Sequence, residues 1–181
     1  MSNGAIDRDS SLTKRDAVDD IVDQWAAQRP DIDVSPLQVF GRLHRVYLRY
    51  HSALNVLFDA HNINMASFDV LAALRRSGAP YRMTAGQLAS TSLVTTGGIT
   101  LRVDRLEKAG LVIRERDAED RRIVYTQLTP EGLKVIDAVA GAHFTNESKL
   151  LAGLNQGESA ELARLLSLLE RSIDAETGGA S

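Results

Sequence analysis

Apolar residues recur every three or four positions along most of this chain, which is the spacing of an amphipathic helix. With capping residues as start signals and Gly or Pro as end signals, the pattern predicts helices at about residues 13–29, 36–60, 67–77, 85–90, 96–109, 130–151 and 155–174. Predicted N-terminal caps are Ser35, Ser67, Thr84 and Asn155. Residues 111–116 and 123–128 are instead rich in β-branched side chains and flank polar residues 117–122, which predicts a hairpin with a charged tip. The predicted fold class is mainly α with a small β-hairpin (α+β).

One face of the helix predicted at 96–109 faces a core. Its apolar stripe, at i, i+4 and i+7, is Ile99, Val103 and Leu106. Thr95 or Thr96 can cap its first turn, and we expect it to end at Gly110 in a left-handed conformation. Together with the short helix before it, this helix forms a predicted helix-turn-helix.

The opposite side of this helix has its small residues early and its cations late. That gradient suits a helix in the DNA major groove, where N-terminal residues approach base edges and later cations meet phosphates. The predicted DNA contacts of the helix and the turn before it are Thr95, Thr96, Gly97, Gly98, Thr100, Leu101 and Arg105. Arg105 is the strongest candidate among them.

The hairpin tip adds Asp120, Arg121 and Arg122 to the predicted DNA contacts. The two arginines can reach phosphates or a narrow minor groove, and Asp120 is near enough in sequence to orient one guanidinium. A solvated turn whose charges only maintain solubility is the alternative. The adjoining helix favours DNA contact.

Four segments, in their order and spacing, resemble the MarR family of transcription regulators. They are FDVLAALRRSG at 68–78, GGITLRVDRLEKAGLV at 97–112, DRR at 120–122 and LTPEG at 128–132. The resemblance implies a winged helix-turn-helix whose second helix enters the major groove while Arg122 enters the minor groove. This chain has Leu101 where the family usually has a polar residue, often Asn. A leucine cannot hydrogen-bond a base, although it can contact a thymine methyl group.

We expect helices that serve dimerisation on both sides of a winged helix-turn-helix domain at 61–129. The other predicted parts are a mobile N-terminus at 1–12, N-terminal helices at 13–60, C-terminal helices at 130–174 and a mobile tail at 175–181. The long N-terminal helix is apolar on more than one face and the last helix carries a continuous leucine stripe, so both need a partner surface. A homodimer on an inverted repeat is predicted, and a monomeric bundle that buries these stripes internally is the alternative.

The overall formal charge of −3 is unusual for a DNA-binding protein, but the distribution of charge is not. Residues 71–122 hold ten Lys or Arg against six Asp or Glu, a net charge of +4, which leaves −7 for the rest of the chain. A basic centre in an acidic frame concentrates the attraction for DNA where the contacts are predicted. The predicted partner is therefore double-stranded DNA.

Several other classes of protein are disfavoured. The chain has no cysteine, which excludes disulfides and thiolate metal sites, and it has no phosphate-binding loop or hydrolase elbow. His44 and His51 lie two turns apart on one predicted helix, but two histidines make only half a metal site, so no metal or cofactor is predicted. No apolar run is long enough for a membrane span or a secretory signal. We therefore expect a cytoplasmic protein that is not an enzyme.

A second resemblance concerns ligand sensing. The added N-terminal helix, with Trp25 followed by AAQRPDIDVSP, is similar to a branch of the MarR family that responds to urate or related purines. The resemblance implies that Trp25, Asp69, Arg102 and Arg114 line or support a pocket for urate, xanthine or another small anionic aromatic ligand. An indole can stack on a planar heterocycle, and a guanidinium can pair with an anionic oxygen. The alternative is structural: Trp25 packs the added helix on the core, and Asp69 pairs with Arg102.

Together these features predict a sequence-specific DNA-binding transcription regulator, a repressor that a ligand releases from DNA. A ligand-insensitive architectural protein with weak sequence preference is the alternative. The two differ in a footprint, since a regulator protects one short inverted repeat and an architectural protein coats DNA uniformly as salt allows.

Overall fold

The structure is a computed structural model that describes residues 14–91 and 98–178. It divides into two compact units, one of which ends at His143 while the other continues from Phe144. None of the helices in the described residues combines the length and the apolar composition that a membrane span requires.

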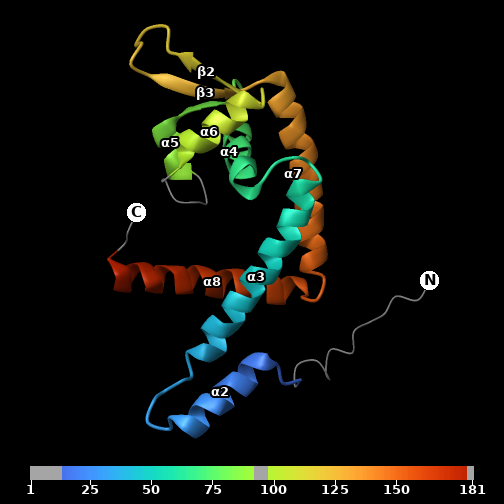
Figure 1. Cartoon of the computed structure of the whole chain (residues 1–181), viewed down its shortest axis with the longest axis vertical. Coiled ribbons are helices and arrows are strands. Elements are labelled where there is room, and N and C mark those ends of the chain that lie inside the picture. The colour runs from blue at the N-terminus through green and yellow to red at the C-terminus, as the bar shows by residue number, and fades with distance from the viewer. Residues whose placement is uncertain (1–13, 92–97, 179–181) are drawn as a thin grey trace, which may run out of the picture. The chain divides into compact units, whose positions relative to one another are not determined.

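The unit that ends at His143 combines helices with a small sheet (Figure 1). Its elements are α2 (Ala17–Gln28), α3 (Leu37–Asp59), α4 (Met65–Arg76), β1 (Arg82–Thr84), α5 (Ala85–Thr91), α6 (Ile99–Lys108), β2 (Val112–Arg116), β3 (Val124–Leu128) and the first part of α7 (Pro130–Leu150). The strands form an antiparallel sheet in the order β1-β3-β2. The predicted mainly helical fold with a β-hairpin around 117–122 is confirmed, whereas β1 was not predicted.

One apolar core joins these elements. Its buried side chains come from α3 to α7 and from all three strands: Leu54, Phe58, Phe68, Val70, Leu71, Ala73, Leu74, Met83, Leu88, Ile99, Val103, Leu106, Leu111, Val112, Leu128, Ile136 and Val139. Burial of each large apolar side chain contributes roughly 1.5–3 kcal/mol to stability. The stripe predicted for the second helix of the helix-turn-helix lies in this core, so the opposite face of α6 points away from it.

Glycines with positive φ flank both ends of α6. Its N-cap is Gly98, with φ of 118° and no side-chain cap hydrogen bond, whereas the sequence predicted a cap by Thr95 or Thr96. Both threonines lie outside the described residues. Gly110 follows the helix with φ of 71°, the left-handed conformation that was predicted there.

Two other predicted caps, Ser67 for α4 and Ser35 for α3, are wrong. Asn64 caps α4, and its Oδ1 accepts a hydrogen bond from the Ser67 amide at 2.8 Å. The Ser35 amide donates to Asp33 at 2.9 Å, and α3 begins at Leu37 without a side-chain cap. Capping boxes are confirmed at Thr84 with Gln87 and at Asn155 with Glu158.

The start of α7 explains the LTPEG segment. The Thr129 hydroxyl donates to the Gly110 carbonyl at 2.8 Å and accepts from the Gly132 amide at 2.9 Å. A Cβ on Gly132 would lie 1.9 Å from the carbonyl oxygen of Leu111, so no larger residue fits without moving the backbone. These contacts fix α7 against the residue that leads into β2.

The added helix α2 is held on α3 by a polar clamp and a small apolar contact. Arg42 on α3 reaches Asp16 at 3.0 Å and Asp19 at 2.8 Å. Val18 is buried, and a Cβ on Gly41 would lie 3.0 Å from its Cγ1. Asp16 is also the N-cap, so α2 begins later than the predicted start near residue 13.

The unit that continues from Phe144 contains the end of α7 and α8 (Gln156–Thr177). No residue of α8 is buried. The helix runs to Thr177 and ends at Gly178, with φ of 75°. The sequence predicted a mobile tail from residue 175, whereas residues 175–177 belong to α8 and residues 179–181 lie outside the described residues.

Candidate nucleic-acid interface

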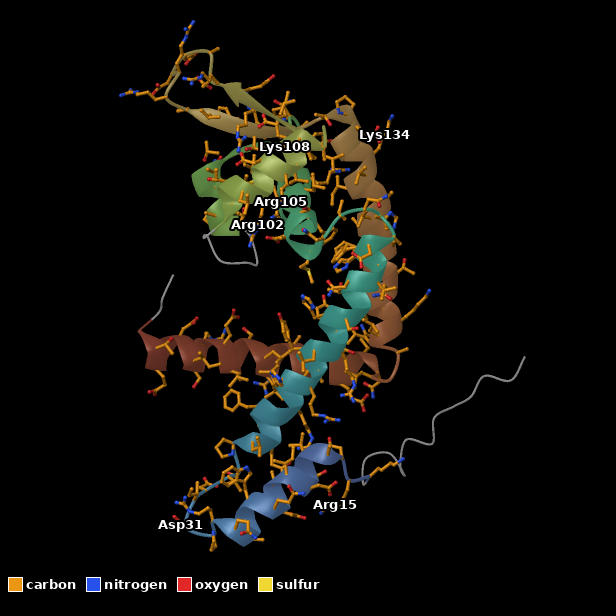
Figure 2. All side chains as sticks on the ribbon, viewed as in Figure 1. Arg15, Asp31, Arg102, Arg105, Lys108 and Lys134 are labelled. Atoms are coloured by element: carbon orange, nitrogen blue, oxygen red, sulfur yellow. The ribbon has the colours of Figure 1, made fainter. Side chains whose placement is uncertain are left out.

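The outer face of α6 is an exposed stripe with one apolar residue and two cations. Leu101, Arg105 and Lys108 are exposed and fall at i, i+4 and i+7, so they share one side of the helix. Thr100 beside them is also exposed. Figure 2 shows Arg105 and Lys108 following one another along α6. The gradient predicted from the sequence, with small side chains early and cations late, is present on the described part of the helix.

An ion-pair bracket joins α6 to the hairpin. Arg114 on β2 contacts Asp104 and Glu107 on α6, each at 2.5 Å. The pKa of the Arg114 guanidinium is raised, mainly by its hydrogen bond with Asp104. This bracket compensates two carboxylates of α6 and orients the hairpin relative to the helix, so the outer stripe keeps its positive character.

The hairpin tip presents Arg122, whose side chain is 92% exposed. Asp120 Oδ1 and Oδ2 accept from its Nε and Nη2 at 3.1 and 3.2 Å, and Oδ1 also accepts from its backbone amide at 3.0 Å. The hydrogen bonds from the Arg122 side chain lower the pKa of Asp120 below its ordinary value. The prediction that Asp120 orients one tip guanidinium is confirmed for Arg122.

Further hydrogen bonds fix the backbone of the tip. Asp117 accepts from the amides of Glu119 and Asp120 at 2.9 and 3.0 Å, and these bonds lower the pKa of its carboxyl. Arg116 donates to the carbonyl of Arg121 at 3.3 Å. These hydrogen bonds fix the backbone of the turn that carries Arg121 and Arg122.

The turn that leads into α6 is only partly described. The predicted contacts Thr95, Thr96 and Gly97 lie outside the described residues. Directly before the turn, Arg76 of α4 donates a hydrogen bond to the carbonyl of Thr91 at 3.2 Å, which links the end of α5 to α4.

Arg105 also borders a cavity of about 450 Å³ between α6 and the α3–α4 turn. The lining residues are Asp59, Asn62, Ile63, Asn64, Ser67, Arg105, Leu106, Ala109 and Leu111. Arg105 is exposed although it borders this cavity, so its side chain remains accessible to a bound partner at the surface of α6.

The four residues predicted for a ligand pocket do not meet within one chain. Asp69 is buried on α4, and α4 packs on α6, where Arg102 is half-buried with an Nη1 that has no hydrogen-bond partner among the described residues. Trp25, 48% exposed, lines a different, apolar cavity beside the α2–α3 linker and Phe40.

The length of α3 separates these two places. Phe68, next to Asp69, packs on Phe58 with ring centroids 4.9 Å apart. From Phe40 to Phe58 the helix rises about 27 Å, at about 1.5 Å per residue. Within one chain, Trp25 therefore lies far from Asp69 and Arg102, and Arg114 pairs with Asp104 and Glu107.

Two polar features of this region were not predicted. The guanidinium of Arg82 on β1 lies over the Tyr125 ring at 4.4 Å, and Arg116 braces the tip from the end of β2. A three-residue strand shows too little alternation to detect in a sequence. An arginine directly before a predicted turn is a signal that could have identified Arg116.

Comparison with known proteins agrees with this geometry. Residues 61–123 match the model of the MarR family. The chain is 40% identical over 156 residues to the HTH-type transcriptional regulator PecS of Dickeya dadantii, which covers 86% of this chain and 94% of PecS. The chain belongs to the MarR family. It is a DNA-binding transcription regulator with a winged helix-turn-helix, and the relatives it matches are regulators rather than enzymes.

Solved MarR-family structures share the fold. A mutant MarR of E. coli complexed with operator DNA is 27% identical, with a TM-score of 0.65 over 76% of this chain and 99% of that one. BpsR of Bordetella bronchiseptica, whose DNA binding is regulated by 6-hydroxynicotinic acid, is 24% identical, with a TM-score of 0.67 over 75% of this chain and 95% of that one. The latter likeness concerns the fold alone.

Proposed function

We propose that this MarR-family protein is a homodimeric repressor that binds an inverted repeat through two copies of the α6 and wing surface. The observation that carries the proposal is the pairing of an exposed Leu101–Arg105–Lys108 stripe with an exposed, oriented Arg122 on one core. A helix of this kind fits the major groove, and a wing arginine fits the adjacent minor groove. One such surface covers a half-site, so two-fold symmetry extends it to an inverted repeat.

Exposed apolar side chains support a dimer. Those on α3, α7 and α8 include Phe40, Val46, Tyr47, Leu48, Val56, Phe144, Leu150, Leu162, Leu165, Leu166 and Ile173. Monomeric proteins rarely expose so many large apolar residues on whole helices. The occupant that we propose for these faces is a second copy of the chain.

Selection of bound duplexes from random DNA tests the function. We expect enrichment of one short inverted repeat whose half-sites are centred about one helical turn apart, roughly 10 base pairs. Recovery of unrelated sequences, bound with equal affinity and equal dependence on salt, would instead support an architectural protein.

We propose further that a small anionic aromatic ligand, of which urate and xanthine are the first candidates, releases the dimer from DNA. Arg102 Nη1 is buried and has no hydrogen-bond partner within residues 14–91 and 98–178, which supports an anion site where α6 packs on α4, since a buried guanidinium donor gains from an anionic acceptor. Trp25 would join such a site only from a second copy. BpsR offers a precedent for a small planar anion as effector in a protein of this fold.

Trp25, the only tryptophan, reports on this ligand. We expect millimolar urate or xanthine to quench its emission and to dissociate the DNA complex. Asp69→Asn is expected to keep the quenching but to weaken the release, because it removes the carboxylate that an anion repels. If neither purine changes emission or DNA affinity, the ligand proposal fails while the DNA-binding proposal stands.

A further inference from the structure

Leu101 is an exception on the outer face of α6. Its described neighbours on that face, Thr100, Asp104, Arg105 and Lys108, are polar or charged, yet Leu101 is apolar and 55% exposed. The core of this unit takes its α6 contribution from the opposite stripe, so Leu101 is not part of that core. About half of its side chain stays in contact with solvent, which contributes less to stability than a core position would.

Its position in the helix brings it close to any bound base. The first residue of α6 is Ile99, so Leu101 lies in the first turn, one turn before Arg105 and two before Lys108. In a helix that enters the major groove, first-turn residues reach base edges while later cations reach phosphates. The cation order along α6 therefore places Leu101, together with Thr100, among the base-edge positions.

The chemistry of that side chain restricts what it can recognise. Leucine has no donor or acceptor, so it cannot pair with the hydrogen-bonding groups that distinguish guanine, cytosine and adenine. Thymine alone among the four bases presents a methyl group in the major groove. Covering that methyl removes apolar surface of both partners from water, which favours the contact.

We propose that Leu101 selects a thymine in each half-site by covering its 5-methyl group. The inference rests on the proposed function, because it requires α6 to lie in the major groove. It also predicts that 5-methylcytosine, which carries a methyl at the same place, is bound better than cytosine at that position.

The test removes the methyl group from the DNA and the leucine from the protein, separately and together. Using the duplex obtained by selection, each thymine is replaced in turn by deoxyuridine, and Kd is measured at fixed salt for the wild-type chain and for Leu101→Ala. At one position per half-site, we expect the replacement to weaken wild-type binding about fourfold, the value for one buried methyl-sized group. The same replacement is expected to leave Leu101→Ala binding unchanged.

Lys108→Ala is the matched control from the same stripe. This variant is expected to bind every duplex more weakly but to keep the full sensitivity to deoxyuridine, because we expect Lys108 to contact a phosphate rather than a base. Leu101→Asn adds a gain of function, since repeated selection is expected to enrich adenine at the affected position.

Two results would overturn the inference. One is a scan in which no thymine responds to loss of its methyl. The other is a responsive thymine whose effect is equal in the wild type and Leu101→Ala. Failure of the initial selection to enrich any sequence would contradict the proposed function itself, so the two failures are distinguishable.

Discussion

At the scale of single residues, Asp120 determines where the Arg122 guanidinium lies. The carboxylate accepts from Nε and Nη2 of an arginine that is otherwise almost fully exposed. A solvent-exposed pair of this kind contributes little to stability. Its effect is therefore on orientation, since it holds the guanidinium at the tip in advance of DNA binding.

Arg122→Ala is expected to weaken binding of the selected duplex about tenfold or more, the cost of losing one arginine contact, while the melting temperature stays nearly unchanged. Kd by anisotropy and a thermal melt measure the two effects. Lys134→Ala is the control, because it also removes one exposed cation, but from α7 (Figure 2). Equal losses for both variants would show that Arg122 acts only through net charge.

Gly132 is a residue whose role is steric. Gly132→Ala would place a methyl 1.9 Å from the Leu111 carbonyl oxygen, so α7 or the start of β2 must shift. We expect destabilisation of about 1–3 kcal/mol or more, measured by urea unfolding. Gly141→Ala on the same helix meets nothing within 4 Å and is expected to be neutral or slightly stabilising. Equal stabilities of the two variants would contradict the steric assignment.

Local contacts of residues were predictable and distant ones were not. Asp120 is close in sequence to Arg121 and Arg122, so the sequence predicted that it orients one guanidinium, and the structure shows that this is Arg122. The bracket from Arg114 to Asp104 and Glu107 depends on how β2 packs on α6, which no local pattern encodes. The sequence instead suggested a ligand for Arg114.

At the scale of elements, α2 is attached to α3 mainly through Arg42. Asp16 and Asp19 both pair with this arginine. The pKa of Asp16 is lowered mainly by a hydrogen bond from the Val18 amide, and that of Asp19 mainly by the Asp16 amide and then by Arg42. Because both pKa values are lower in the folded chain than the ordinary value of 3.8, the two ionised carboxylates stabilise the fold above that pH. This stabilisation is lost as the pH falls from 3.8 through the lowered pKa values.

Arg42→Met is expected to loosen α2 and expose Trp25, which shifts its emission to longer wavelength. The readout is unambiguous because the chain has one tryptophan. Arg29→Met removes a pair with Asp31 in the α2–α3 linker and leaves the clamp intact, so its emission should not change. Identical spectra for Arg42→Met and the wild type would show that the clamp does not hold the helix.

The helices were predictable from their apolar period, but their starts were less so. Asn64 precedes Ser67 by three residues, and either residue type can cap a helix, so the sequence alone favoured the wrong one. At α6 the cap is a glycine with a positive φ, which offers no side-chain signal. Strand β1 was missed because it is paired only through tertiary contact with β3.

At the scale of the whole molecule, the account requires two copies of the chain. Leu162, Leu165, Leu166 and Ile173 on α8 are exposed, and all follow the helical stripe. We expect Leu162→Glu with Leu166→Glu to weaken dimerisation at least about a hundredfold, since each subunit loses two apolar contacts and gains two charges. Light scattering over a dilution series measures the effect.

Leu168→Glu is the matched control for this face. Leu168 is also exposed on α8 but lies about 120° around the helix from Leu162 and about 160° from Leu166, at 3.6 residues per turn. Its substitution is expected to leave the dimer intact. Dimers from both variants would place the interface elsewhere. Monomers from both would show that the effect is not specific to the stripe of Leu162 and Leu166.

The central claim is that α6 and the wing discriminate between DNA sequences. The most direct measurement is the affinity for the selected duplex and for a scrambled duplex of equal composition over a series of salt concentrations. We predict that the selected duplex is bound at least about 1,000-fold more tightly at physiological salt, and that both affinities fall as salt rises. Equal affinities with the same salt dependence would contradict the account and leave a protein that binds DNA by charge alone.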